Sequence, residues 1–141
     1  MPVNLQPPLK LFTVEAANRL LPGIRARLAE LRAAHKTILA LQGKVDIEEL
    51  TGAGRDGVLS ENAQTVIAAL HTDLERRMES FEESLEEFHA LGCELKDLGK
   101  GLVDFYTMRG GELALLCWQD GEESIAFWHP LEGGYGARQP L

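Results

Sequence analysis

Residues that could hold a metal ion or move a proton lie in the C-terminal third of the chain, within short apolar runs. Asp104 interrupts "LVDF", and His129 closes "SIAFWH". A buried carboxylate must find a partner, and Arg109 and Arg138 are the first candidates. An Asp–Arg pair that fixes the end of the chain is one interpretation of Asp104, and an anion or metal pocket is the other.

A metal site in this region would use His129 and Glu112. With a two-residue turn between the strands, Glu112 is the carboxylate on the neighbouring strand that comes nearest to the imidazole. Glu122 is excluded within one subunit, because along an extended strand it lies about 20 Å from His129, too far to share one ion. A histidine followed by Pro130 at a strand end also fits a hydrogen-bonded or interfacial residue. The cofactor therefore stays unknown, and a divalent metal is the one that these residues suggest.

The other reactive or aromatic side chains of this region are one thiol and two indoles. Cys117 stands in mid-strand between Leu116 and Trp118, where a buried, inert thiol is expected rather than a nucleophile. The chain has no nucleophile elbow, no HExxH sequence and no dinucleotide fingerprint, so an enzyme is the hypothesis with the least support. The residues that could form a ligand-binding or interface cluster are Asp104, Cys117, Trp118, Trp128, His129 and Arg138.

The hydrophobic pattern of this region predicts a small antiparallel meander. Segments rich in turn-forming residues separate the apolar runs, and Asp120-Gly121 is a strong hairpin signal. The predicted strands are 102–105, 112–118 and 124–129, and 93–97 is a fourth strand or a lead-in.

Both faces of the predicted sheet are apolar. A two- or four-residue turn places Trp118 on the face of His129 and Cys117 on the face of Trp128, and a three-residue turn exchanges these partners. A sheet with one solvated face should alternate apolar and polar residues, so both faces need a cover. The helices can cover one face, and the tail or a second chain must cover the other. This requirement is our reason to expect a homodimer.

Two long helices precede the sheet. Apolar residues recur in steps of three and four from 13 to 42, with His35 as the one polar member of the seam, and from 61 to 91 a second stripe does the same. We therefore expect an α+β fold, in which two long antiparallel helices pack on a small C-terminal antiparallel β-meander. The chain is expected to be a single domain over 1–141, with a helical hairpin at 13–91 and the sheet and tail at 92–141.

Local signals predict where these helices begin and end. Thr13 and Ser60 are good N-caps. Pro22 cannot donate a backbone hydrogen bond, which predicts a kink or a restart in the first helix. Gly43 predicts the end of that helix. The long, glycine-rich connection that follows it lacks the Lys-Ser/Thr ending of a phosphate-binding loop.

Composition narrows the classes of partner. The 141 residues carry a formal net charge of −8, which argues against nucleic acid and against anionic membranes, because both need a basic surface. No apolar run approaches the length of a spanning helix, and the first residues lack the pattern of a signal peptide. The two cysteines form no CxxC pair, so we expect reduced thiols and a cytoplasmic protein.

Three segments together resemble a known family. "FTVEAANRLLP", "GLVDF" and "LLCWQDGEESIAFWHPLEGGYGARQPL" are similar to the bacterial domain of unknown function numbered 2203, over nearly the whole chain. Tyr106 departs from the pattern, because a proline is expected after "GLVDF". The resemblance implies a small, soluble bacterial protein and supplies no catalytic residues.

Two functions remain in view from the sequence. The first is a non-enzymatic homodimeric module that binds another protein, which the doubly apolar sheet and the long helices favour. The alternative is a metal- or small-ligand-binding protein that uses a polar cluster near Asp104, His129 and Arg138.

Overall fold

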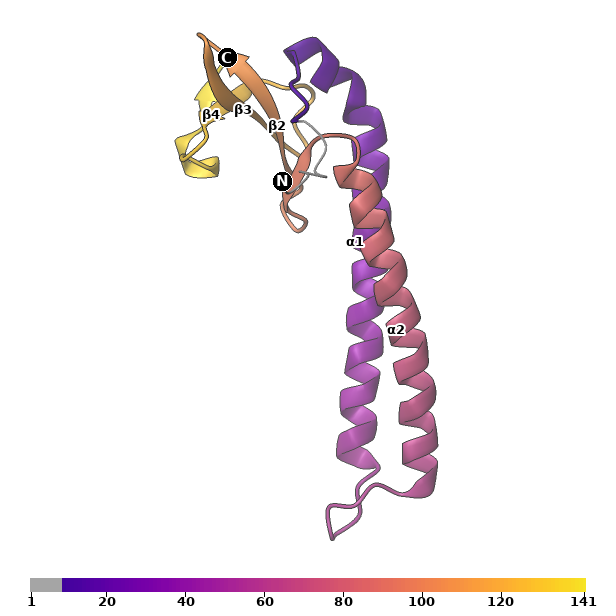
Figure 1. Cartoon of the computed structure of the whole chain (residues 1–141). Coiled ribbons are helices and arrows are strands. Elements are labelled where there is room, and N and C mark those ends of the chain that lie inside the picture. The colour runs from indigo at the N-terminus through magenta and orange to yellow at the C-terminus, as the bar shows by residue number, and fades with distance from the viewer. Residues whose placement is uncertain (1–8) are drawn as a thin grey trace, which may run out of the picture. The chain divides into compact units, whose positions relative to one another are not determined.

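A computed structural model gives the structure of residues 9–141. Two helices are followed by a five-stranded antiparallel sheet (Figure 1), which confirms the predicted α+β class. The described chain forms two compact units: Ala29–Glu86 is one, and the chain up to Leu28 together with Glu87–Leu141 is the other. The boundary between the units therefore falls inside both helices. A single domain over 1–141 stays a prediction.

The first helix, α1 (Val14–Thr51), begins as expected but ends later. The Thr13 hydroxyl accepts a hydrogen bond from the Ala16 amide at 3.1 Å, which confirms the N-cap. The prediction that Gly43 ends the helix is wrong. Leu41 and Val45 on either side of it are buried, and this burial outweighs the cost of about 1 kcal/mol for a glycine inside a helix. The helix likewise continues through Pro22 without a break.

The second helix, α2 (Glu61–His89), begins at the predicted cap, because the Ser60 hydroxyl accepts from the Ala63 amide at 3.1 Å. Within the unit Ala29–Glu86 the two helices run side by side and are joined by the connection 52–60 (Figure 1). The predicted seam is only partly buried there. Leu74 is buried, but Met78 is 46% exposed. His35 is exposed and lies 6.1 Å from the ring of Phe81.

The sheet has the strand order β1-β2-β3-β4-β5, so each strand pairs with its neighbours in the sequence. The predicted meander is therefore confirmed. The second strand is longer than expected, because it continues up to a tight turn at Gly110-Gly111, where both glycines have positive φ, as hairpin turns of this kind require. The strands are β1 (Glu94–Asp97), β2 (Leu102–Arg109), β3 (Glu112–Gln119), β4 (Phe127–Pro130) and β5 (Gln139–Pro140).

One face of the sheet packs against the start of α1 and the residues before it. Phe105 and Trp118, on adjacent strands, are both fully buried on this face. The ring of Phe12 meets that of Phe105 edge-on at 5.2 Å, and the Arg25 guanidinium lies over the indole of Trp118 at 5.6 Å. Burial of these rings supplies much of the driving force that joins this end of α1 to the sheet.

The tail covers the opposite face. A short 3-10 turn, η1 (Tyr135–Ala137), and β5 bring the end of the chain beside β4. The Arg138 guanidinium lies 4.1 Å from the centre of the Phe127 ring, and Leu115 and Cys117 are buried. The tail is one of the two covers that the sequence predicted. Within the described chain, an open sheet face is therefore no longer a reason to expect a homodimer.

Neither α1 nor α2 contains a stretch long and apolar enough to cross a membrane.

The continuous α1 predicts the effect of replacing Gly43. A Cβ built at this position has nothing within 4 Å, so Gly43→Ala should raise the free energy of unfolding by about 0.5–1 kcal/mol. Gly52→Ala is the matched control, because its Cβ would collide with Ala63 and should lower stability by about 1–3 kcal/mol. Urea unfolding measures both. A helix that ended at Gly43 would instead be destabilised by alanine there.

Candidate metal centre

Three adjacent strands bring Asp104, Cys117 and His129 together on the face that the tail covers. Asp104 of β2 is directly opposite Cys117 of β3, and Leu115 of β3 is opposite His129 of β4. Opposite residues and alternate residues along a strand share one face of a sheet. All three side chains are buried, and one ligand atom from each lies within 4.8 Å of the other two.

The imidazole of His129 is held at both nitrogens. Nδ1 lies 2.7 Å from the carbonyl oxygen of Pro130, and Nε2 lies 3.1 Å from Oδ2 of Asp104. A carbonyl can only accept, so Nδ1 carries a proton and donates it. Nε2 is thereby left facing the carboxylate of Asp104, and the two side chains form one buried hydrogen-bonded pair.

The Cys117 thiol is protonated at neutral pH. Burial, and after it the negative charge of Asp104, raises its pKa to about 12 against the opposing positive charge of Arg138. The nucleophilic and metal-binding form of cysteine is the thiolate. Cys117 is thus a buried thiol, as the sequence predicted.

The three residue types are those of a Cys–His–Asp triad, but their geometry is different. In a triad one imidazole nitrogen faces the carboxylate and the other takes the proton of the nucleophile. Here Nδ1 of His129 faces the Pro130 carbonyl and Nε2 faces Asp104. No nitrogen is left to act as a base toward Cys117 while Asp104 orients the ring.

The same arrangement fits a transition-metal ion. Imidazole nitrogen, thiolate sulfur and carboxylate oxygen are zinc ligands, and three protein ligands with one open position is the pattern of reactive zinc sites. Bonds of about 2.1 Å that meet at the tetrahedral angle place two ligand atoms about 3.4 Å apart, close to the 3.1 Å between Nε2 and Oδ2. Metal-binding histidines also donate their second N–H to a carbonyl or carboxylate, as His129 does to Pro130.

A cavity of about 270 Å³ lies over these three side chains. The sheet forms its floor and the tail forms part of its wall. A water molecule occupies roughly 30 Å³, so the cavity has room for a ligand larger than water at the open position. The remaining lining residues are Lys96, Leu102, Leu115, Leu131, Gly134 and Tyr135.

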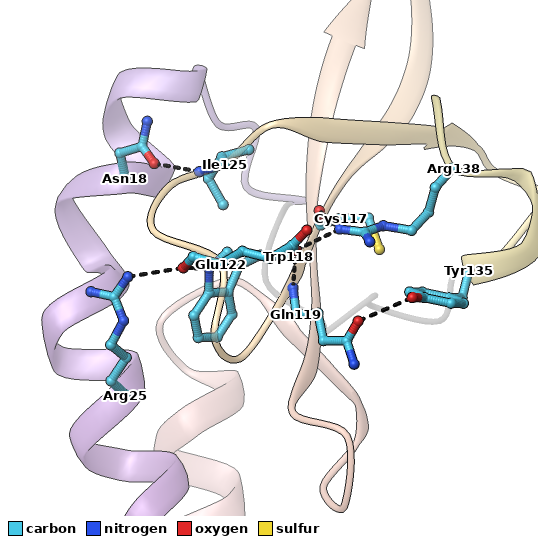
Figure 2. Close-up of polar contacts among 9 residues, drawn as sticks. All are labelled: Asn18, Arg25, Cys117, Trp118, Gln119, Glu122, Ile125, Tyr135 and Arg138. Carbon is cyan, nitrogen blue, oxygen red and sulfur yellow. Dashed lines mark hydrogen bonds and ion pairs between the residues drawn. The ribbon is translucent and has the colours of Figure 1, made fainter. Parts of the chain in front are cut away.

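The connection 120–126 between β3 and β4 is fixed from two sides (Figure 2). From α1, Arg25 donates to the carbonyl oxygen of Glu122 at 3.2 Å, and Asn18 accepts from the Ile125 amide at 2.7 Å. From the tail, Arg138 donates to the Glu122 carboxylate at 2.6 Å. The register between β3 and β4 is the one expected for a three-residue turn. The strand predicted at 124–129 begins only at 127, because residues before it bind α1.

The structure does not bring Glu112 to His129. The register places Glu112 opposite Arg109 at the exposed end of the β2–β3 hairpin, whereas His129 is opposite Leu115. The two-residue turn on which this pairing relied is not the one that forms. Glu112 as a metal ligand loses its geometric support, and Asp104 takes the place of the carboxylate beside the imidazole.

The expected partners of Asp104 are engaged elsewhere. Arg109 lies over the ring of Trp128 at 4.7 Å, on the opposite face of the sheet, and Arg138 pairs with Glu122. The indole N–H of Trp118 donates to the Glu122 carbonyl at 3.0 Å. The two tryptophans therefore pack and do not line the cavity. One signal in the sequence could have predicted that Asp104 meets His129. A three-residue turn between β3 and β4 places Cys117 and His129 on one face, and the β2–β3 register adds Asp104 to that face.

Comparison with known proteins gives a family and no function. The sequence model of the family described as "Uncharacterized conserved protein (DUF2203)" matches residues 10–141. No curated protein and no solved structure matches the chain.

The raised thiol pKa values predict a loss of stability in alkali. Burial raises the pKa of Cys93 from 9.0 to about 11, as it raises that of Cys117 to about 12. Above pH 9 the unfolded thiols lose protons that the folded thiols keep, so rising pH favours unfolding. The free energy of unfolding should fall by about 1.4 kcal/mol per pH unit for each thiol until its folded pKa is reached.

Urea unfolding between pH 8 and 10.5, with a chelator present, measures this slope. Cys93→Ala and Cys117→Ala should each make the slope of the free energy of unfolding against pH shallower by the contribution of one thiol. Titration of lysine and tyrosine contributes equally to the slopes of all three proteins. Parallel slopes for the parent and both variants would contradict the assignment.

Proposed function

We propose that this chain, which belongs to the DUF2203 family, is a metal-binding protein that holds one divalent transition-metal ion, with zinc as the best fit. The ligands would be Oδ of Asp104, Sγ of Cys117 and Nε2 of His129. The observation that carries the proposal is the placement of three different donor atoms within 4.8 Å of one another on one buried face. Bound there, the metal would act as a Lewis acid with one open position.

The charges of the site support a divalent ion. A carboxylate, a thiolate and a neutral imidazole together carry two negative charges, so an ion of charge +2 makes the buried cluster neutral. A neutral cluster avoids the large cost of an uncompensated buried charge. The thiolate and imidazole also favour zinc or a similar ion over magnesium and calcium, which prefer oxygen ligands throughout.

The competing interpretation is an Asp–His pair beside a buried thiol, with no metal. Such a pair satisfies two polar side chains, and native cores contain pairs of this kind. It gives no reason, however, for a third ligand atom at the same point, nor for a cavity above it. Metal content separates the two interpretations.

Protein purified without a metal-affinity step should contain about one equivalent of zinc by elemental analysis. Cobalt added to the metal-free protein should give the absorption of a tetrahedral ion and a thiolate-to-metal charge-transfer band. Loss of a direct ligand in Cys117→Ala or His129→Ala should weaken binding by on the order of 100-fold or more, since loss of an outer partner alone costs 10–100-fold. Cys93→Ala is the matched control, because Cys93 is equally buried but lies outside the cluster.

Proton release gives an independent measure. Loading should release one proton from the Cys117 thiol, whose pKa is raised to about 12, so affinity should rise with pH below that value. Calorimetry in buffers of different ionisation enthalpy measures this proton release. A chain that takes up neither zinc nor cobalt, or a Cys117→Ala variant that binds as tightly as the parent, would defeat the proposal.

A homodimer formed through the helices is the second candidate. Within Ala29–Glu86 the apolar stripe is incompletely covered, and Leu39 and Met78 are 59% and 46% exposed. We infer that the occupant is a second copy of the chain, because the charges are complementary: Lys36 and Lys44 are exposed on α1, and residues 79–86 of α2 carry four glutamates and no basic residue. A second hairpin could cover the stripe and pair these charges.

Light scattering at micromolar concentration should therefore give twice the chain mass, and Met78→Glu should shift the protein to monomer. Ala69→Glu is the control, because residue 69 is exposed and lies on the opposite side of α2 from residue 78. A parent protein that is monomeric at these concentrations would rule out this dimer and leave the metal proposal unaffected.

A further inference from the structure

The tail is attached to the sheet by the short pairing of β5 with β4, by the bonds of Arg138, and by two further hydrogen bonds. The Tyr135 hydroxyl donates to the side-chain oxygen of Gln119 at 3.0 Å (Figure 2). The amide of Leu141 donates to the carbonyl oxygen of Ala126 at 3.0 Å. Residues 131–136 are exposed to solvent, and Leu131, Gly134 and Tyr135 among them line the cavity. A segment with so few buried contacts opens more readily than the strands beneath it.

Arg138 connects the tail to Cys117, one of the three proposed ligands. Its Nη2 donates to the carbonyl oxygen of Cys117 at 3.1 Å and to the carboxylate of Glu122 at 2.6 Å. The guanidinium lies over the ring of Phe127, and Phe127 is directly opposite Cys117 in the sheet. The guanidinium therefore lies on the face from which the Cys117 side chain projects, as Figure 2 shows.

One donor of this guanidinium has no partner. Nε of Arg138 is the buried side-chain nitrogen or oxygen without a hydrogen bond among residues 9–141. Buried donors are almost always paired, and an unpaired one costs free energy. Nearby lies the sulfur of Cys117, which as a thiol is only a weak acceptor. The metal-free site thus leaves a strong donor beside a poor acceptor.

We propose that Arg138 couples metal loading to closure of the tail. A metal-bound Cys117 sulfur carries negative charge, so it becomes a strong acceptor for the guanidinium, and the added hydrogen bond holds the tail closed. The coupling is reciprocal: metal stabilises the closed tail, and the closed tail strengthens metal binding. Arg138 is a positioning residue, because an arginine remains charged and has no lone pair with which to bind the ion. This inference rests on the metal site proposed above.

Hydrogen exchange of the full chain with and without zinc tests the coupling. Zinc should slow exchange of the tail amides by about tenfold, in the range of ordinary coupling between sites. In Arg138→Met, zinc should still bind, about 10–100-fold more weakly as for other outer-shell losses, and tail exchange should no longer respond to it. Tyr135→Phe is the matched control: it removes the hydrogen bond to Gln119 and should speed tail exchange, but zinc should still slow it.

The outcomes separate this inference from the metal site. If the parent binds no metal, the metal proposal fails and the coupling fails with it. If the parent binds cobalt with a thiolate band but zinc leaves tail exchange unchanged, or if Arg138→Met responds to zinc as the parent does, the coupling alone is overturned. Should Arg138→Met fail to fold, Arg138→Lys keeps the charge and loses the planar donor group. It should show a reduced response, and a full response would overturn the role of the guanidinium.

Discussion

The register between β3 and β4 is the constraint on which the site depends. It places His129 opposite Leu115, on the face that carries Asp104. Because side chains alternate across a sheet, a slip of one residue would turn His129 toward the face of Trp118. Asp104 would then be a buried carboxylate with no imidazole beside it, which costs far more than a lost surface contact. The β3–β4 register therefore brings Asp104 and His129 together, and burial of these two side chains as a pair in turn stabilises that register.

Glu122 is the point at which this register is held. Its backbone carbonyl accepts from Arg25 and from the indole of Trp118, and its carboxylate accepts from the Gln119 amide and from Arg138. One residue of the connection thus binds the start of α1, the end of β3 and the tail. Several charge-assisted bonds at one residue give a loop the rigidity that its length alone would not provide.

The sequence predicted those parts of the structure that local signals determine. The helix caps and the meander follow from residues such as Thr13 within a few positions of the element they define. The prediction that Gly43 ends α1 is wrong, because burial of its neighbours outweighs the low helix propensity of glycine. The partner of Asp104 depends on whether the connection between β3 and β4 has an odd or an even number of residues. Contacts with α1, about a hundred residues away in the sequence, fix that number. The sequence places Asp104, Cys117 and His129 in one candidate ligand or interface cluster, but the metal ligands that it predicts are His129 and Glu112, and it does not show where the three side chains meet.

The helical hairpin is an insertion into the unit that contains the site. The chain leaves that unit at Leu28 and returns at Glu87. Beside these two points, Nη1 of Arg27 lies 3.7 Å from Oε2 of Glu87. The contacts described above for Asp104, Cys117 and His129, for the 120–126 connection and for the tail all involve residues outside Ala29–Glu86. Removing or adding one heptad in each helix would keep their apolar stripes in phase and leave all these contacts in place. The length of the helical hairpin is thus free to change during evolution without altering the chemistry of the site.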